Sequence, residues 1–186
     1  MTRENILEAA AQVFRQKGFH GASMQDIAEA VNLQKASLYH HITSKQEILL
    51  ALLDRALELL LERISEISNQ DIRADEKLGQ MIRAYLQILA ENPDLSAVLL
   101  FEHRSLERRQ RARHVPNRDK FEALWREVLI EGVNAKLFKC DDPALTARAI
   151  LGIMNWTITW YRPEGRLEIN EIADHYSNLL LHGLLK

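Results

Sequence analysis

The sequence has few residues that interrupt helices, with only 4 prolines and 7 glycines among 186 residues. Leucine, alanine, glutamate and arginine are abundant instead, and these residues favour helices. The composition therefore predicts an all-α protein. A single cysteine, Cys140, excludes an intrachain disulfide and a zinc site built from cysteines, so we expect a reduced, inert thiol.

Long apolar runs are also missing. No uninterrupted apolar stretch reaches membrane-spanning length, and the first residues lack the apolar core of a signal peptide. These absences predict a soluble, cytoplasmic protein with no membrane partner. The formal net charge is −2 and the pI is about 6.4, which excludes a globally basic coat for nucleic acid. Any affinity for DNA would have to come from a local basic patch.

Apolar residues recur at helical spacing along most of the chain and predict about nine helices. Gly18 is expected to end the first helix. Two pairs that resemble capping boxes, Ser23 with Asp26 and Ser44 with Glu47, open the second and fourth helices. The predicted helices cover about residues 3–17, 23–31, 34–42, 44–67, 78–89, 95–106, 121–138, 143–161 and 170–184.

Residues 23–42 have the layout of a helix-turn-helix, a motif whose second helix enters the major groove of DNA. The second short helix of this stretch carries five polar or aromatic side chains, Lys35, Ser37, Tyr39, His40 and His41. The helix that follows, 44–67, is far longer than such a motif requires. One rigid helix is therefore expected to belong to both halves of the protein.

Residues 1 to about 60 resemble the DNA-binding domain of the TetR family of bacterial transcriptional regulators. The matching segments are ILEAAAQVF, KGF, MQDIAEAV and KASLYHHITSKQEIL. The chain departs from the usual pattern at Asn32, Ala36 and Ile42. Because asparagine tolerates a left-handed backbone, we expect Asn32 to preserve the turn.

The resemblance implies how this domain would contact a DNA operator. Base edges would be faced by four residues, Lys35, Ala36, Ser37 and His40. Phosphates would be contacted by the backbone near Ser23 and by the side chains of Tyr39, His41 and Lys45. This division agrees with the general roles of phosphate contacts, which set register, and of base contacts, which specify sequence. A dimer would read a palindromic operator with half-sites roughly 34–36 Å apart, or a multiple of that.

The remaining residues, 61–186, are predicted to form a second helical domain for ligand binding and dimerisation. The predicted helix over residues 143–161 is apolar nearly all round, and such a helix must be buried on two sides. An identical subunit would supply the second side. The expected homodimer contacts are Leu151, Met154, Ile158, Tyr176, Leu180 and Gly183. A central core helix in a monomer is the alternative.

The segments GIMNWTITWYRPEGRLEINEIADHY and LLLHGL resemble a TetR subgroup that responds to acyl-coenzyme A thioesters. That resemblance implies a repressor of genes for fatty-acid or related acyl-coenzyme A breakdown. Residues 104–120, the basic segment, carry seven basic and two acidic residues, a net charge of +5 that suits phosphates. A solvated charged segment is the alternative. The expected effector-binding residues are Tyr85, Leu89, Phe101, Arg104, Trp125, Ile153, Asn155, Trp156 and Trp160, although ordinary core packing is also open for the aromatic ones.

Two other functions stay open at this point. A repressor of a multidrug efflux system would keep the DNA-binding half and sense hydrophobic, often cationic, compounds. An enzyme would need a catalytic constellation, and the sequence contains no HExxH, GxSxG or phosphate-cradling glycine loop. We therefore expect no catalytic activity, no metal and no cofactor besides the effector. The sequence leaves the operator, the effector, the regulated genes and the choice between repression and activation undefined.

Overall fold

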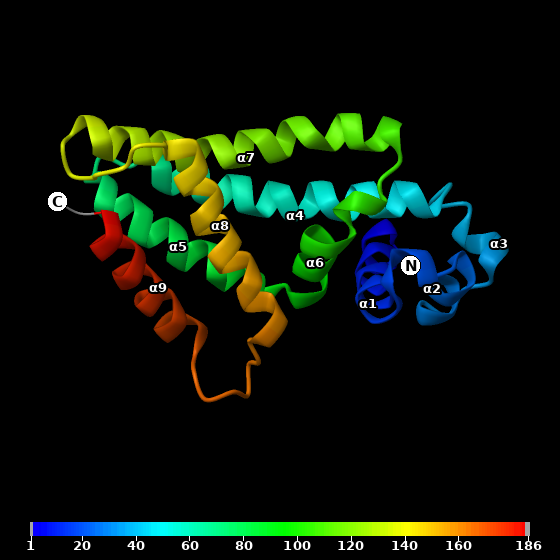
Figure 1. Ribbon diagram of the computed structural model, residues 1–186. Coiled ribbons are helices and arrows are strands. Elements are labelled where there is room, and N and C mark those ends of the chain that lie inside the picture. The colour runs from blue at the N-terminus through cyan, green and yellow to red at the C-terminus, as the bar shows by residue number, and fades with distance from the viewer. Residues whose placement is uncertain (1, 185–186) are drawn as a thin grey trace. The chain divides into compact units, whose positions relative to one another are not determined.

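The computed structural model describes residues 2–184, which form two compact units (Figure 1). Unit 1 consists of the residues up to Glu58 together with Asn92–Asn117. Unit 2 consists of Leu59–Glu91 and the residues from Arg118 onward. Over the described range the regular structure consists of nine α-helices and two short helical turns, which confirms the all-α prediction. The predicted domain limits at residues 1 and 186 lie outside the described residues.

Unit 1 begins with the helix-turn-helix and the helix that precedes it. Helix α1 (Arg3–Gly21) is interrupted at Gly18, whose φ of 70° is left-handed, so the predicted end at this glycine is followed by one further turn. Helices α2 (Met24–Ala30) and α3 (Lys35–Leu38) follow. Helix α3 is shorter than the predicted 34–42, because the chain continues from Leu38 as hydrogen-bonded turns. Helix α4 (Lys45–Ser68) starts in this unit.

Apolar side chains from α1 to α4 hold the helix-turn-helix in place. Ile6, Ile27, Leu38 and Leu49 are each 0% exposed and belong to one core cluster. Full burial of such a side chain is worth roughly 1.5–3 kcal/mol relative to its exposure. Asn32 has a φ of 54°, which confirms that this asparagine supplies the left-handed turn between α2 and α3.

The segment between residues 92 and 117 packs in unit 1, although the sequence analysis placed it in the second domain. It contains α6 (Pro93–Ala97), a π-helical turn η1 (Val98–Glu102), a 3-10 turn η2 (His103–Ser105) and the start of α7 (Arg108–Asn134). The single helix predicted over 95–106 is therefore three shorter turns. Val98 and Leu106 join the apolar core of α1 and α4, which explains why this segment belongs to unit 1.

Helix α7 begins at Arg108, well before the apolar pattern that predicted a helix only from residue 121. The arginine-rich stretch is thus helical and contains Pro116 inside the helix. Proline removes one backbone donor, and the exposed position of Pro116 leaves the unpaired carbonyl open to water. The apolar signal missed this stretch because its exposed side chains are charged.

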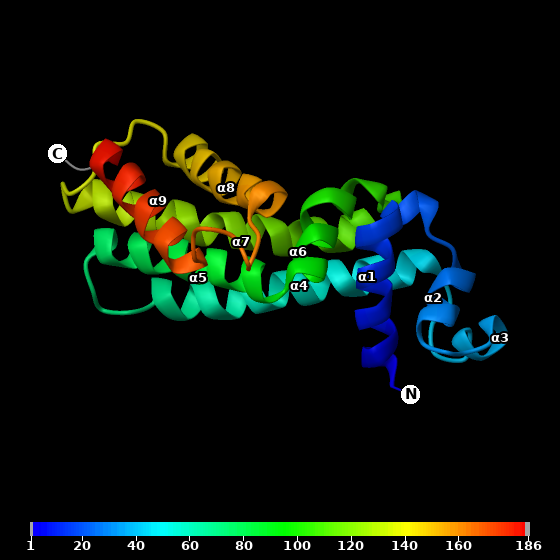
Figure 2. The same cartoon turned by 90° about the horizontal axis from the view of Figure 1, so that it is seen from below.

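Unit 2 is built from α5 (Ala74–Glu91), α8 (Pro143–Trp160), α9 (Ile169–Leu184) and the later parts of α4 and α7. Helices α8 and α9 form its outer layer, with α5 and α7 behind them (Figures 1 and 2). Asp142 caps α8 by accepting hydrogen bonds from the N–H groups of Ala144 and Leu145, as the Asp-Pro pair predicts. Among residues 2–184 no helix has the length and hydropathy needed to cross a membrane.

Candidate nucleic-acid interface and effector site

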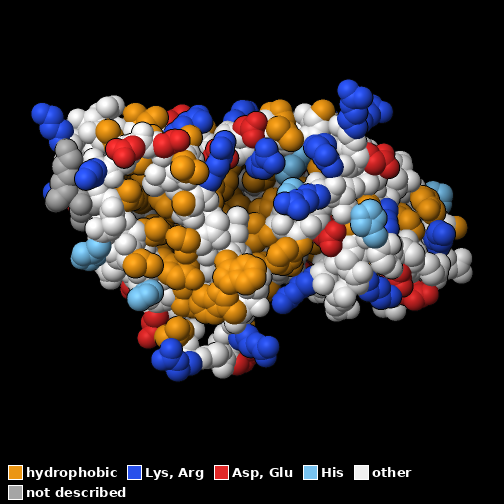
Figure 3. Space-filling model, in the orientation of Figure 1, with side chains coloured by type: hydrophobic (Ala, Val, Ile, Leu, Met, Phe, Trp, Pro, Cys, Tyr) orange, Lys and Arg blue, Asp and Glu red, His pale blue; other side chains and the backbone are white. Residues whose placement is uncertain are grey.

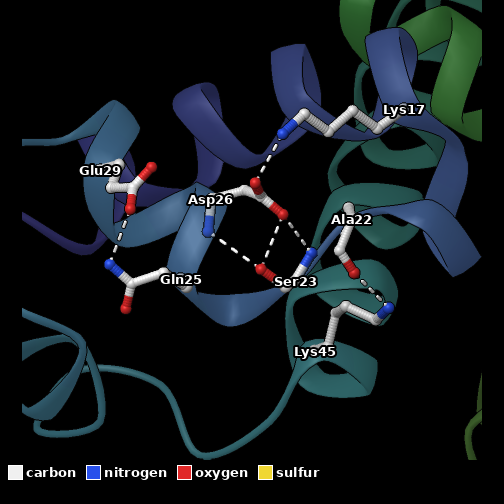
Figure 4. Close-up of polar contacts among 7 residues, drawn as sticks. All are labelled: Lys17, Ala22, Ser23, Gln25, Asp26, Glu29 and Lys45. Carbon is white, nitrogen blue, oxygen red and sulfur yellow. Dashed lines mark hydrogen bonds and ion pairs between the residues drawn. The ribbon is translucent and has the colours of Figure 1, made fainter.

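Ser23 and Asp26 form a reciprocal capping box at the start of α2 (Figure 4). The Asp26 backbone N–H donates to Ser23 Oγ at 3.1 Å, and the Ser23 backbone N–H donates to Asp26 Oδ2 at 2.7 Å. The Lys17 ammonium lies 2.5 Å from Asp26 Oδ1. The hydrogen bonds from Lys17 and then from Ser23 hold the pKa of Asp26 well below its ordinary value. The network therefore fixes the backbone at Ser23 as it enters α2.

Lys45, which the resemblance assigned to a phosphate, already has partners inside the protein. Its Nζ donates to the carbonyl oxygens of Phe19 and Ala22, both at 2.6 Å, and lies 4.4 Å from the centre of the Phe19 ring. These contacts tie the first turn of α4 to the end of α1. The structure thus gives Lys45 a positioning role that the sequence analysis did not include.

The predicted base-reading residues lie at the exposed side of α3. Lys35, Ala36 and His40 are exposed, and Ser37 is half-buried. Leu38 is 0% exposed and anchors the opposite side of the same turn in the core. Tyr39 is 45% exposed and His41 is exposed. The structure therefore brings the predicted DNA-contact residues of α3 and the following turn to the surface, while Leu38 and Ile42 anchor the same stretch in the core.

Gln46 connects the start of α4 to the junction before α7, and the sequence analysis missed it. Its Nε2 donates to the Ser105 carbonyl at 2.8 Å, and its Oε1 accepts from the Glu107 backbone N–H at 3.1 Å. Both partners are about 60 positions away in the sequence, so no local pattern could reveal the pairing. Gln46 follows Lys45 directly, and together they fix the first turn of α4 on both sides.

His114 is a second connection between α7 and α4 inside unit 1. Its side chain is 4% exposed, and its Nδ1 lies 3.2 Å from Asp54 Oδ1. A buried imidazole next to a carboxylate is oriented by that partner. The early part of α7 is thereby attached to α4 through a polar contact as well as through the shared core.

In unit 2 an aromatic cluster, formed by Tyr85, Phe121 and Trp125, occupies the interior between α5 and α7. Tyr85 stacks on Phe121 with ring centres 5.9 Å apart, and Trp125 meets Tyr85 edge-on at 6.0 Å. The Tyr85 hydroxyl donates to Asn155 Oδ1 of α8. Burial raises the pKa of Tyr85, so the phenol stays neutral and remains a donor. This hydrogen bond connects the half-buried Asn155 of α8 to α5.

The structure gathers only part of the predicted effector-binding set around this cluster. Tyr85, Trp125 and Asn155 meet there, and Leu89 is buried in the same unit. Two predicted residues, Phe101 and Arg104, belong to unit 1 and are exposed. Three others lie on the exposed side of α8, with exposures of 36% for Ile153, 67% for Trp156 and 42% for Trp160. Phe121, which was not in the predicted set, stacks on Tyr85.

The α8 residues predicted at the dimer interface differ in how far the chain itself buries them. Met154, predicted at a dimer interface, is 0% exposed within the chain itself, and Leu151 and Ile158 are half-buried. The exposed side instead carries Leu145, Trp156 and Trp160. The helical spacing of apolar residues indicated two apolar sides of α8. This spacing could not decide which of the two sides faces the chain's own core. Of the predicted α9 residues, Tyr176 and Leu180 are half-buried and Gly183 is exposed.

The arginines of the basic segment are exposed, and few of them have partners. Arg118 pairs with its neighbour Asp119 at 3.3 Å. Arg111 donates to the carbonyls of Arg104 and Leu106. Arg109 and Arg113 form no ion pair with any carboxylate between residues 2 and 184, and their spacing of four places them on one side of α7. The segment therefore keeps uncompensated positive charge at the surface.

Two family models match the chain. Residues 6–52 match the model described as "Bacterial regulatory proteins, tetR family", and residues 71–184 match "Tetracyclin repressor-like, C-terminal domain". A curated relative, the HTH-type transcriptional repressor KstR2 of Mycobacterium tuberculosis, is 28% identical over 99% of this chain and 93% of its own.

Two solved structures extend the likeness to the fold. The TetR family transcriptional regulator PfmR from Thermus thermophilus is 36% identical with a TM-score of 0.88, covering 97% of this chain and 99% of PfmR. The crystal structure of AibR in complex with isovaleryl coenzyme A and operator DNA is 29% identical with a TM-score of 0.90, covering 96% of this chain and 97% of AibR.

The Asp26 network makes a prediction about acid stability. A lowered folded-state pKa stabilises the protein above the ordinary aspartate pKa, and this stabilisation is lost as the pH falls through the folded pKa. Asp26→Asn should therefore lower the melting temperature at pH 7. The difference from the wild type should shrink as the pH is taken below about 4.

Thermal unfolding followed by circular dichroism between pH 3 and 7 measures both effects. Asp71→Asn, at an exposed aspartate, is the control and should match the wild type throughout. If the melting temperature of Asp26→Asn stayed below that of the wild type by a constant amount down to pH 3, the charge on Asp26 would not be what stabilises the fold.

Proposed function

The chain belongs to the TetR family of bacterial transcriptional regulators, and from this premise we propose that it is a homodimeric repressor of acyl-coenzyme A breakdown. It would bind a palindromic operator and be released by an acyl-coenzyme A thioester. The observation that supports this most strongly is the exposed side of α3, held by the buried Leu38, within a segment that matches the family model.

In the proposed complex α3 enters the major groove. Lys35 donates to guanine O6 or N7, Ser37 and His40 offer further polar contacts, and the Ala36 methyl touches a thymine methyl. The backbone at Ser23 and the side chains of Tyr39 and His41 hold phosphates. Lys45 acts mainly by keeping α1 and α4 in register, and the capacity of its ammonium for a third hydrogen bond leaves room for a phosphate.

We place the dimer interface on the exposed sides of α8 and α9. Leu145 and Leu179 are 63% and 59% exposed, and Trp156 and Trp160 of α8 are exposed as well. Figure 3 shows hydrophobic side chains gathered on this face of the molecule. Contiguous apolar surface of this kind marks interaction sites. A stable dimer buries about 1,200–2,000 Å² in total, and two long helices per subunit provide a surface of that order. A twofold pair also explains how one chain would read a palindrome.

An acyl-coenzyme A effector is supported by the likeness to AibR, whose structure contains isovaleryl coenzyme A and operator DNA. The apolar interior around Tyr85 suits an acyl chain, and Asn155 adds a polar group. Failure of both short- and long-chain thioesters to bind the purified protein would exclude this effector class.

An effector can release the protein from DNA only if it binds more tightly to a conformation that does not fit the operator. Helices α4 and α7 each contribute residues to both units, so they are the elements through which we propose that the preference is transmitted. The contacts of Lys45 and Gln46 fix the first turn of α4, next to the helix-turn-helix. A change in α4 would therefore alter how the operator is read.

Lys35 provides the test of sequence reading. We call the DNA upstream of the gene that encodes this protein the upstream region. Lys35→Ala should reduce the preference for this region over random DNA by about 1–3 kcal/mol, because a base contact is lost. Lys45→Met should weaken both duplexes to a similar extent, because it disturbs the whole helix-turn-helix. Mobility shifts at fixed salt measure both affinities.

Lys139→Ala removes one exposed positive charge from unit 2 and serves as the control, which should behave as the wild type. If Lys35→Ala kept the full preference for the upstream region, α3 would not be the element that reads sequence.

Trp156 provides the test of the interface. Trp156→Glu places a charge at the centre of the proposed apolar contact and should convert dimers to monomers at micromolar concentration. Sedimentation velocity measures this change. Ile130→Glu, at a 40% exposed position on α7, is the matched control and should remain dimeric. Unchanged sedimentation of Trp156→Glu, or a monomeric wild type, would contradict the proposed interface.

A further inference from the structure

Trp125 carries a buried hydrogen-bond donor without an acceptor. The side chain is 0% exposed, and its indole Nε1 has no hydrogen-bond partner in the part of the chain that the structure describes. Buried tryptophans usually place this N–H on a partner, and most buried polar groups in native proteins are hydrogen-bonded. The unpaired N–H of Trp125 is an exception to this pattern, and it lies in the interior where the proposed effector would bind.

The surroundings of Trp125 restrict what could accept this hydrogen bond. Its closest aromatic neighbours are Tyr85 and Phe121, with ring centres 6.0 and 6.2 Å away. The Tyr85 hydroxyl donates its proton to Asn155 Oδ1 and makes no hydrogen bond with the Trp125 indole. An ordered water needs two to four polar partners, and the aromatic carbons of Tyr85 and Phe121 supply none, so only the Tyr85 hydroxyl and Asn155 could help to hold one there. The site therefore favours an acceptor that arrives attached to an apolar molecule.

The acceptor should also be uncharged. Burying an anion among apolar rings is strongly unfavourable unless a cation pairs with it. The buried lysine of this unit, Lys77, is already paired with Glu131, at 2.8 Å. Phosphates and free carboxylates are thus poor ligands for the interior. A cation would bring no acceptor to the indole N–H, whereas a carbonyl next to an alkyl chain meets every requirement.

We propose that Trp125 is the residue that recognises the acyl carbonyl of the effector, with its Nε1–H donating to the thioester oxygen. This proposal rests on the effector class given above and adds the group that is recognised. The bond satisfies a donor that otherwise stays unpaired, so a ligand without the carbonyl loses affinity. The loss expected for one unpaired buried donor is about 5- to 150-fold.

Calorimetry with matched ligands tests this role. The ligands are isovaleryl- and octanoyl-coenzyme A and the corresponding thioethers, in which CH₂ replaces the carbonyl. The wild type should bind each thioester about 5- to 150-fold more tightly than its thioether. Trp125→Phe keeps an aromatic ring without the N–H, and it should bind thioester and thioether equally. Ile130→Ala, at an exposed position on α7 outside both proposed sites, should keep the wild-type preference.

Nuclear magnetic resonance supplies a second readout, in which the ligand response is measured on the wild type and Trp125→Phe serves only to assign a signal. The chain has 3 tryptophans and therefore three indole N–H signals, of which the one missing in Trp125→Phe belongs to Trp125. In the wild type this signal should move downfield when a thioester binds and should not move downfield with the thioether. A Trp125 signal that responds identically to both ligands would overturn the proposal.

The outcomes separate this inference from the proposed function. If thioesters bind but the wild type does not distinguish them from thioethers, only the role of Trp125 is wrong. If no thioester binds at all, the proposed effector class and the proposed role of Trp125 are both wrong. DNA binding by α3 is independent of either result.

Discussion

The continuity of two helices constrains everything else that this regulator can do. Helices α4 and α7 each begin in unit 1 and end in unit 2. Backbone hydrogen bonds stiffen both helices, although Pro116 removes one donor from α7. We therefore expect a change imposed on one part of α4 or α7 to affect the rest of that helix. Inside unit 1 the two helices are attached to each other by the buried contact between His114 and Asp54. A signal in unit 2 would therefore act on a connected pair of helices.

The first turn of α4 is held by several directional contacts. Lys45 binds two carbonyls at the end of α1, and Gln46 binds two backbone groups before α7. Backbone partners cannot be changed by substitution of their side chains, which makes such contacts tolerant of sequence variation around them. In our account these contacts place α3 for DNA, and the hydrogen bond between Tyr85 and Asn155 organises the interior where the effector would bind.

The sequence predicted the elements whose signals are local. The Ser23 capping box and the left-handed turn at Asn32 behave as their local chemistry predicts, and Gly18 interrupts the first helix where an end was expected. Features that depend on distant partners were missed, such as the pairing of Gln46 with Ser105 and the placement of residues 92–117 in unit 1. The buried side of α8 could not be predicted, because both sides are apolar and only packing against the rest of unit 2 decides which one is buried. The helical start of α7 was missed because a charged, exposed helix has no apolar stripe.

The central claim is that occupancy of the interior of unit 2 and DNA binding by unit 1 are energetically coupled. Linkage requires the coupling to be reciprocal. The most direct measurement is the dissociation constant of isovaleryl-coenzyme A for the free protein and for its complex with the upstream DNA, at one salt concentration. We expect the DNA complex to bind the thioester about 5- to 150-fold more weakly. Equal dissociation constants in the two states would contradict the account.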